Sequence, residues 1–258
     1  MSFFFVTIKF YFYRTLSEFI LYVGQNIKIM KRIPLDNKLV DVVRGDFLLF
    51  LIFYRLGITE AYGNLTVRQA CLKYKVDVDF CTLVVNSFLD RNYVPEINVE
   101  NISVDNIMTY LSRLHETYVN EYIREIKEKF ISLRQLKSTR TLNMINKIFL
   151  KSENNYLLHQ NYKLEYVYPY VEKYLKGELN ELKDDIYFFI KYEEETYKDE
   201  CEAEIDDLIN LCLAYVPPGR QRESVILLGV LESFKRDVMH YLKIEQLCLF
   251  DRVRKLKS

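Results

Sequence analysis

Residues 221–256, QRESVILLGVLESFKRDVMHYLKIEQLCLFDRVRKL, follow a helical pattern for 36 residues without a proline. Three further stretches of this kind precede it, at 103–136, 141–176 and 179–214. They are separated by a polar turn at Lys137–Thr141, by Gly177 and by Pro217-Pro218-Gly219. Helices of this length span about 50 Å at about 1.5 Å per residue. Joined by short turns, they predict an up-down four-helix bundle, and no stretch alternates with period two as a strand would.

The composition agrees with an all-α fold. Seven Gly and five Pro in 258 residues are few for a β protein, which needs many tight turns. Half of the residues are hydrophobic, which is enough for a packed core. Lys plus Arg and Asp plus Glu number 36 each, so the net charge is zero. Because a dedicated nucleic-acid binder usually carries a basic excess, we expect no nucleic-acid partner.

A smaller helical domain is predicted at 31–95, ahead of the bundle at 100–258. Apolar residues recur at three- and four-residue steps between Leu39 and Tyr54 and predict one helix ending at Gly57. A second helix follows, with Asn64 or Thr66 as its N-cap, and a third begins after Asp77 or Asp79. The first apolar face comprises Leu39, Val42, Val43, Phe47, Phe50, Leu51 and Tyr54. The linker is expected around Val94-Pro95-Glu96.

Residues 1–30 form an N-terminal extension rich in Phe, Tyr and Ile. Lys9, Arg14 and Glu18 interrupt its apolar run, which therefore falls short of the ~20 residues of a membrane span. The extension is either an aromatic segment packed on the body or sequence upstream of a natural start at Met30. We favour the second interpretation.

Five cysteines, with no CxxC pair, predict reduced, buried thiols and a cytoplasmic location. The chain contains no Walker loop, GxSxG or GxGxxG motif, and the sequence does not predict an enzyme. The acidic run Glu193-Glu194-Glu195 is interpreted as a solvated helix face. Tyrosines at 162, 166, 168, 170 and 174 are expected in the core, or around a small pocket.

The three histidines, His115, His159 and His240, fall in the first, second and fourth long helices. A four-helix bundle can hold two metal ions with His and carboxylate side chains that project inward from facing helices. Three histidines also fall in three helices by chance, so their number alone does not decide the question.

Residues 33–93 and 103–258 together resemble the iron-sulfur cluster repair di-iron proteins, which have a ScdA-type helical domain and a hemerythrin-like domain. The matching stretches are LGITEAYGNLTVRQAC (56–71), YLSRLHETYV (110–119), HQNYKLEYVYPYV (159–171), DDLINLCLAYVPP (206–218) and RDVMHYLKIEQLCLF (236–250). The resemblance implies a cytoplasmic stress-response protein with a hemerythrin-like fold and a possible iron centre.

The resemblance implies His115, His159 and Glu245 as the remaining metal ligands. Other ligand positions of the family are changed: Lys163 stands for a Glu, Lys198 for a His, and Tyr241 for the His that precedes Glu245 by four residues. His240 is one residue early, so its side chain should point about 100° away. In the small domain, Ala61-Tyr62 replaces the family's Cys-Cys pair, and Cys71 matches its later cysteine.

These changes predict a degenerate di-iron site. A buried lysine needs a partner, so we expect Lys163 or Lys198 to pair with Glu245 across the bundle core, where the metal would lie. Two functions follow from the sequence. One is a hemerythrin-like metal or stress-response protein with an impaired iron site at His115, His159 and Glu245. The other is a metal-free regulatory or protein-interaction module, with a homo-oligomer or another protein as partner.

Overall fold

The computed structural model describes residues 32–60, 63–136, 140–215 and 219–257, and this part of the chain is all-α. The all-α prediction is confirmed, since the described residues form no strand beyond an isolated bridge between Lys38 and Thr66. The expected N-terminal extension, 1–30, and the Ala61-Tyr62 pair lie outside the described residues. No helix in the described ranges is long and apolar enough to cross a membrane.

Four short helices come first in the described chain. They are α2 (Leu39–Gly45), α3 (Leu49–Arg55), α4 (Val67–Tyr74) and α5 (Val78–Leu89). Thr66 caps α4 in a reciprocal capping box with Gln69, and the Asp77 carboxylate accepts a hydrogen bond from the Phe80 amide at the start of α5. Of the alternative N-caps left open by the sequence, Thr66 and Asp77 are therefore the ones used.

The prediction of a single helix through Leu39–Tyr54 is wrong. The chain becomes extended at Asp46, whose carboxylate accepts a hydrogen bond from the Leu48 amide at 3.1 Å. This break turns α3 relative to α2, and the core then receives Leu49, Ile52 and Phe53. The aromatic side chains expected to be buried, Phe47, Phe50 and Tyr54, are exposed instead. Gly57 ends the segment as expected, with φ +97°.

Four long helical segments follow, close to the predicted ranges, and each is interrupted by a five-residue π-helical turn. The turns, named here η2 to η5, were not predicted. The segments are α6 (Val104–Thr117), η2 (Tyr118–Tyr122) and α7 (Ile123–Leu136); α8 (Arg140–Tyr162), η3 (Lys163–Val167) and α9 (Tyr168–Leu175); α10 (Asp184–Tyr192), η4 (Glu193–Tyr197) and α11 (Lys198–Ala214); and α12 (Gln221–Glu245), η5 (Gln246–Phe250) and α13 (Asp251–Lys257).

The third long segment begins five residues later than predicted. Gly177 has a left-handed φ of +74°, and the chain stays non-helical until Lys183, which has an extended conformation. Asp184 and Asp185 occupy the first turn of α10, where their negative charge is favourable for the helix dipole. The segment between Leu89 and α6 contains only the short 3₁₀ helix η1 (Val99–Asn101).

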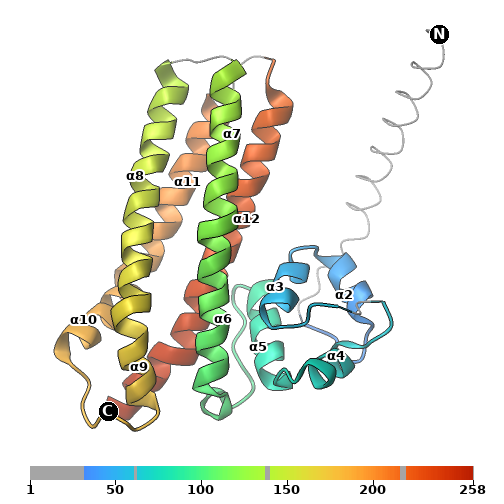
Figure 1. Ribbon diagram of the computed structural model, residues 1–258, viewed down its shortest axis with the longest axis vertical. Coiled ribbons are helices and arrows are strands. Elements are labelled where there is room, and N and C mark those ends of the chain that lie inside the picture. The colour runs from blue at the N-terminus through green and yellow to red at the C-terminus, as the bar shows by residue number, and fades with distance from the viewer. Residues whose placement is uncertain (1–31, 61–62, 137–139, 216–218, 258) are drawn as a thin grey trace.

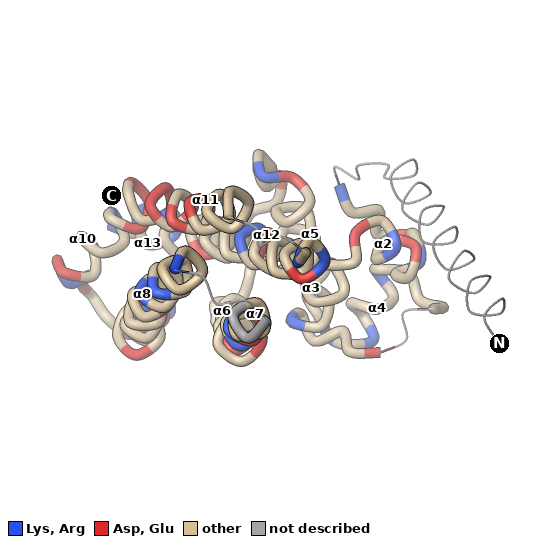
Figure 2. Tube along the Cα trace, turned by 90° about the horizontal axis from the view of Figure 1, so that it is seen from above, with Lys and Arg blue, Asp and Glu red and all other residues tan. Residues whose placement is uncertain are grey.

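The long helices lie side by side (Figure 1). Helix α7 packs against α8 and α12, and α11 packs against the same two helices. The short helices adjoin them through α5, which contacts α12, and α3, which contacts α6. Buried hydrophobic residues from Ile33 to Val253 form one continuous core. Acidic and basic residues are interspersed along the helices (Figure 2).

Candidate functional site

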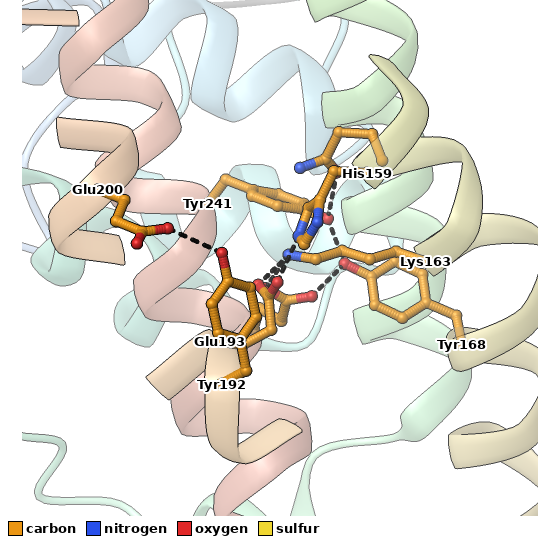
Figure 3. Close-up of polar contacts among 9 residues, drawn as sticks. His159, Lys163, Tyr168, Tyr192, Glu193, Glu200 and Tyr241 are labelled. Carbon is orange, nitrogen blue, oxygen red and sulfur yellow. Dashed lines mark hydrogen bonds and ion pairs between the residues drawn. The ribbon is translucent and has the colours of Figure 1, made fainter. Parts of the chain in front are cut away.

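The ammonium group of Lys163 lies at the centre of a buried polar cluster (Figure 3). Its Nζ is 2.8 Å from Oε2 of Glu245, and it also forms an ion pair with Glu193. All three side chains are at most 4% exposed. Burying an unpaired ion is costly, and here one cation is held between two carboxylates. We call this set, together with the side chains that contact it below, the Lys163 cluster.

The π-helical turns bring these groups together. Lys163 is the first residue of η3, Glu193 is the first residue of η4, and Glu245 directly precedes η5. The first long segment contributes Tyr118, the first residue of η2, whose ring packs on Tyr241 with centroids 5.9 Å apart. All four interruptions therefore adjoin the same region of the interior. π-helical turns in proteins are frequently found at functional sites.

His159 lies one helical turn before Lys163 on α8 and contacts the same carboxylate of Glu193. Its Nε2 forms an ion pair with Oε1 of Glu193. The imidazole stacks on the ring of Tyr197, with centroids 3.8 Å apart and an interplanar angle of 16°. Tyr197 and Glu193 are four residues apart, so one face of the third long segment supplies both partners.

Two tyrosines and a glutamine close the cluster on the side of Glu245. Tyr168 donates a hydrogen bond to Oε1 of Glu245 at 2.7 Å, and its hydroxyl contacts that of Tyr241. Tyr241 donates in turn to Oε1 of Gln160 at 2.9 Å. The ring of Tyr241 also faces Lys163, whose Nζ lies 5.3 Å from its centroid.

The two carboxylates differ in acidity. Burial raises the pKa of Glu245 to about 7, and the Glu193 charge adds to this effect against the opposing Lys163. Burial also acts to raise the pKa of Glu193, but Lys163 and His159 outweigh it, and that pKa is lowered. For Lys163, burial acts to lower the pKa, but the two carboxylates prevail and raise it. The shifts therefore favour the charged forms of Lys163 and Glu193, while the pKa of Glu245 lies near neutrality.

The structure brings together two of the three residues that the sequence suggested as metal ligands. His159 and Glu245 both belong to the Lys163 cluster, but they contact Glu193 and Lys163 rather than each other. His115 is half-buried on α6, its Nδ1 has no hydrogen-bond partner, and burial lowers its pKa. No polar contact joins His115 to the cluster in the described part of the chain.

The expected pairing of a lysine with Glu245 is confirmed for Lys163. Lys198, the alternative partner, opens α11 and lines a separate pocket. The prediction that His240 points away is confirmed: it contacts the Tyr110 hydroxyl at 3.1 Å and the Phe88 ring.

Sequence reasoning missed Glu193, which was expected on a solvated face and is 4% exposed. A usable signal was present in the spacing. The pairs His159/Lys163, Glu193/Tyr197 and Tyr241/Glu245 are each four residues apart, and all six residues belong to the cluster or pack on it. A search for the same spacing in the third long segment would have selected Glu193 instead of Lys198.

The cluster does not fit a di-iron centre. No group of three or more His, Cys, Asp and Glu side chains in the described ranges is arranged to hold a metal ion. The ammonium of Lys163 lies between the two carboxylates, and its raised pKa keeps it protonated. A protonated amine donates hydrogen bonds and has no lone pair for a metal.

No protein-family model matches the sequence, and a comparison with curated proteins finds none of significant similarity.

Proposed function

We propose that the chain is a metal-independent member of the hemerythrin-like proteins, a four-helix bundle joined to a small ScdA-like domain, that acts as a regulatory or interaction module. The observation that carries the proposal is Lys163, a buried ammonium held between Glu193 and Glu245. Its charge neutralises carboxylates that would otherwise need a metal ion. The packing of α7 and α11 against both α8 and α12 supports the bundle. The five described cysteines are free and buried, which supports a cytoplasmic location.

Metal analysis of the intact protein, purified without air, tests this function. We expect iron well below one atom per chain and no optical band from an iron centre. About two irons per chain, as a bundle di-iron site holds, would overturn the proposal.

A substitution sharpens the test, because Lys163 stands where the family that the chain resembles has a Glu. Lys163→Glu places a third carboxylate beside Glu193, Glu245 and His159, and we expect it to bind Fe²⁺ or Mn²⁺ where the parent chain does not. Lys151→Glu makes the same charge change at an exposed position of α8 and should leave metal binding unchanged. Equal metal binding by the parent chain and Lys163→Glu would contradict the role given to Lys163.

The second candidate is the impaired iron site that the family resemblance implies. It is favoured by one observation: His159, Glu193 and Glu245 converge from three helices. This candidate requires any bound iron to be lost in His159→Ala and in His115→Ala. Iron that survives both substitutions would exclude it.

A further inference from the structure

A pocket of about 430 Å³ lies where α5, α11 and α12 meet, outside the Lys163 cluster. Five cationic side chains line it, and the only carboxylate among its lining residues is that of Glu232. The cations come from three parts of the chain: Arg91 follows α5, Lys198 opens α11, and Lys235, Arg236 and Lys243 belong to α12. Long-range packing therefore assembles this concentration of positive charge, which is absent from any one stretch of sequence.

Three of the five cations are paired with carboxylates. Arg91 pairs with Glu202, Lys235 with Asp206, and Arg236 with Asp46. Lys243 is different: in the described ranges its ammonium donates to the backbone carbonyls of Asp90 and Arg91, at 3.1 and 2.9 Å, and forms no ion pair.

Lys198 has no ion pair within the described ranges. The pocket thus contains two ammonium groups, those of Lys198 and Lys243, that form no ion pair within the described part of the chain.

Burial and neighbouring cations lower the pKa of basic groups at the pocket. The pKa of Lys243 is lowered to about 8, mainly by burial; Asp90 acts to raise it and Lys198 acts to lower it. Burial also lowers the pKa of His240, in the pocket wall, to about 3, with contributions from Arg55, Lys243 and Arg236. An anion in the pocket would offset the repulsion that these groups experience.

One wall of the pocket is apolar. Phe88 and Met239 line it, and the guanidinium of Arg236 lies over the Phe88 ring at 4.0 Å from the centroid. The volume exceeds that of a lone inorganic anion, and small-molecule sites typically combine apolar walls with a few polar anchors. The remaining space suits an organic group attached to the anion.

We propose that this pocket binds a small organic phosphate, with Lys198 and Lys243 holding the phosphoryl group and Phe88 and Met239 contacting the organic part. A phosphoryl group has about two negative charges and several acceptor oxygens that point in different directions. It can therefore accept hydrogen bonds from two ammonium groups that belong to different helices, Lys198 on α11 and Lys243 on α12. A carboxylate, flat and singly charged, would be satisfied by one arginine. This inference rests on the proposed function in one respect: it names a ligand for the proposed regulatory or interaction module.

Calorimetry on the full chain tests the proposal, with ribose 5-phosphate and pyrophosphate as probes. The buffer contains about 150 mM salt, at which the Debye length is about 8 Å. We expect ribose 5-phosphate to bind, and Lys198→Met and Lys243→Met each to weaken binding by about tenfold, equivalent to about 1.4 kcal/mol. Lys151→Met removes a charge from an exposed site on α8 and should bind like the parent chain.

Lys243 also supports the backbone after α5, so Lys243→Met alone could act through folding. Lys198→Met decides the test in that case, because Lys198 forms no ion pair within the described ranges that its loss would break. Absence of binding by both probes, or equal affinity in Lys198→Met and Lys151→Met, would overturn the inference. A parent chain that binds ribose 5-phosphate and also contains two irons would leave the pocket standing and remove the metal-independent function.

Discussion

Removing a charged group from water costs several kcal/mol, and Lys163, Glu193 and Glu245 are all withdrawn from it. The three are tolerable only as a set, because each carboxylate faces the same ammonium. Deleting Lys163 leaves two buried carboxylates, of which only Glu193 keeps a basic neighbour, His159.

We therefore expect Lys163→Met to lower the free energy of unfolding by about 3–5 kcal/mol, measured by urea denaturation at pH 7. Lys151→Met, at an exposed position of the same helix, should change it by less than about 0.5 kcal/mol. Adding Glu245→Gln to Lys163→Met should recover part of the loss. A Lys163→Met protein as stable as Lys151→Met would show that the cluster does not depend on its cation.

His240 provides a pH-dependent contribution to stability. Its pKa, lowered to about 3 from 6.5, means that the unfolded chain takes up a proton below pH 6.5 while the folded chain does not. The contribution of this histidine is full above pH 6.5 and is lost as the pH falls toward 3, at up to about 1.4 kcal/mol per pH unit.

His240→Gln should remove this contribution, so its unfolding free energy should fall less between pH 6.5 and 4 than that of the parent chain. Equilibrium unfolding at several pH values gives both slopes. The comparison isolates His240 because the Tyr110, Arg55, Lys243 and Arg236 groups around it are the same in both proteins. Parallel slopes would contradict the assignment.

The partner of Lys163 could be predicted from the sequence, since a buried lysine requires a carboxylate and Glu245 was the inward-facing candidate. Glu193 could not be found by the same reasoning, because a run of three glutamates is typical of a solvated face. Only the tertiary position of η4 shows that Glu193 points inward while Glu195 stays exposed.

At the scale of helices, the long segments were predictable because breakers are scarce, and only Pro169 and Gly229 lie inside them. The π-helical turns were not predicted, since each inserts one residue into an otherwise regular pattern, and only η3 has a helix breaker beside it, Pro169. Such a turn shifts the helical face by about 100°. Lys198 was assigned to the interior because the family's third-helix His position falls on it, while the structure places Glu193 and Tyr197 there.

Gly57 ends α3 in a conformation that side chains rarely adopt. We expect Gly57→Ala to destabilise the chain by about 1–2 kcal/mol, because φ is +97° and the added Cβ would meet the Arg113 guanidinium at 3.4 Å. Gly63→Ala is the matched control, since its Cβ would meet nothing within 4 Å and its φ is not positive. Thermal unfolding of both variants checks this, and equal midpoints would contradict the strain at Gly57.

For the whole molecule, the sequence predicted helices but not how the short ones attach to the long ones. The attachment includes a second buried ion pair, Arg55 of α3 with Asp237 of α12, joined at 2.8 and 2.6 Å in a bidentate arrangement. Arg113 of α6 adds a hydrogen bond to the Arg55 carbonyl at 2.7 Å. Arg55 and Asp237 lie 182 positions apart in the chain, and no local pattern links them.

Arg55→Met leaves the Asp237 carboxylate buried without its partner, so we expect a loss of about 3–5 kcal/mol. If the pair fixes α3 to α12, hydrogen exchange should accelerate first in α3 and α5, which lie at that contact, and least in α8 and α11. Arg68→Met, which removes an exposed pair with Asp36, should cost less than about 1 kcal/mol. Replacing both partners, Arg55→Met with Asp237→Leu, removes the unpaired charge and should restore much of the stability. Uniform acceleration over every helix would instead mean that the short and long helices unfold as one unit, as their shared core also permits.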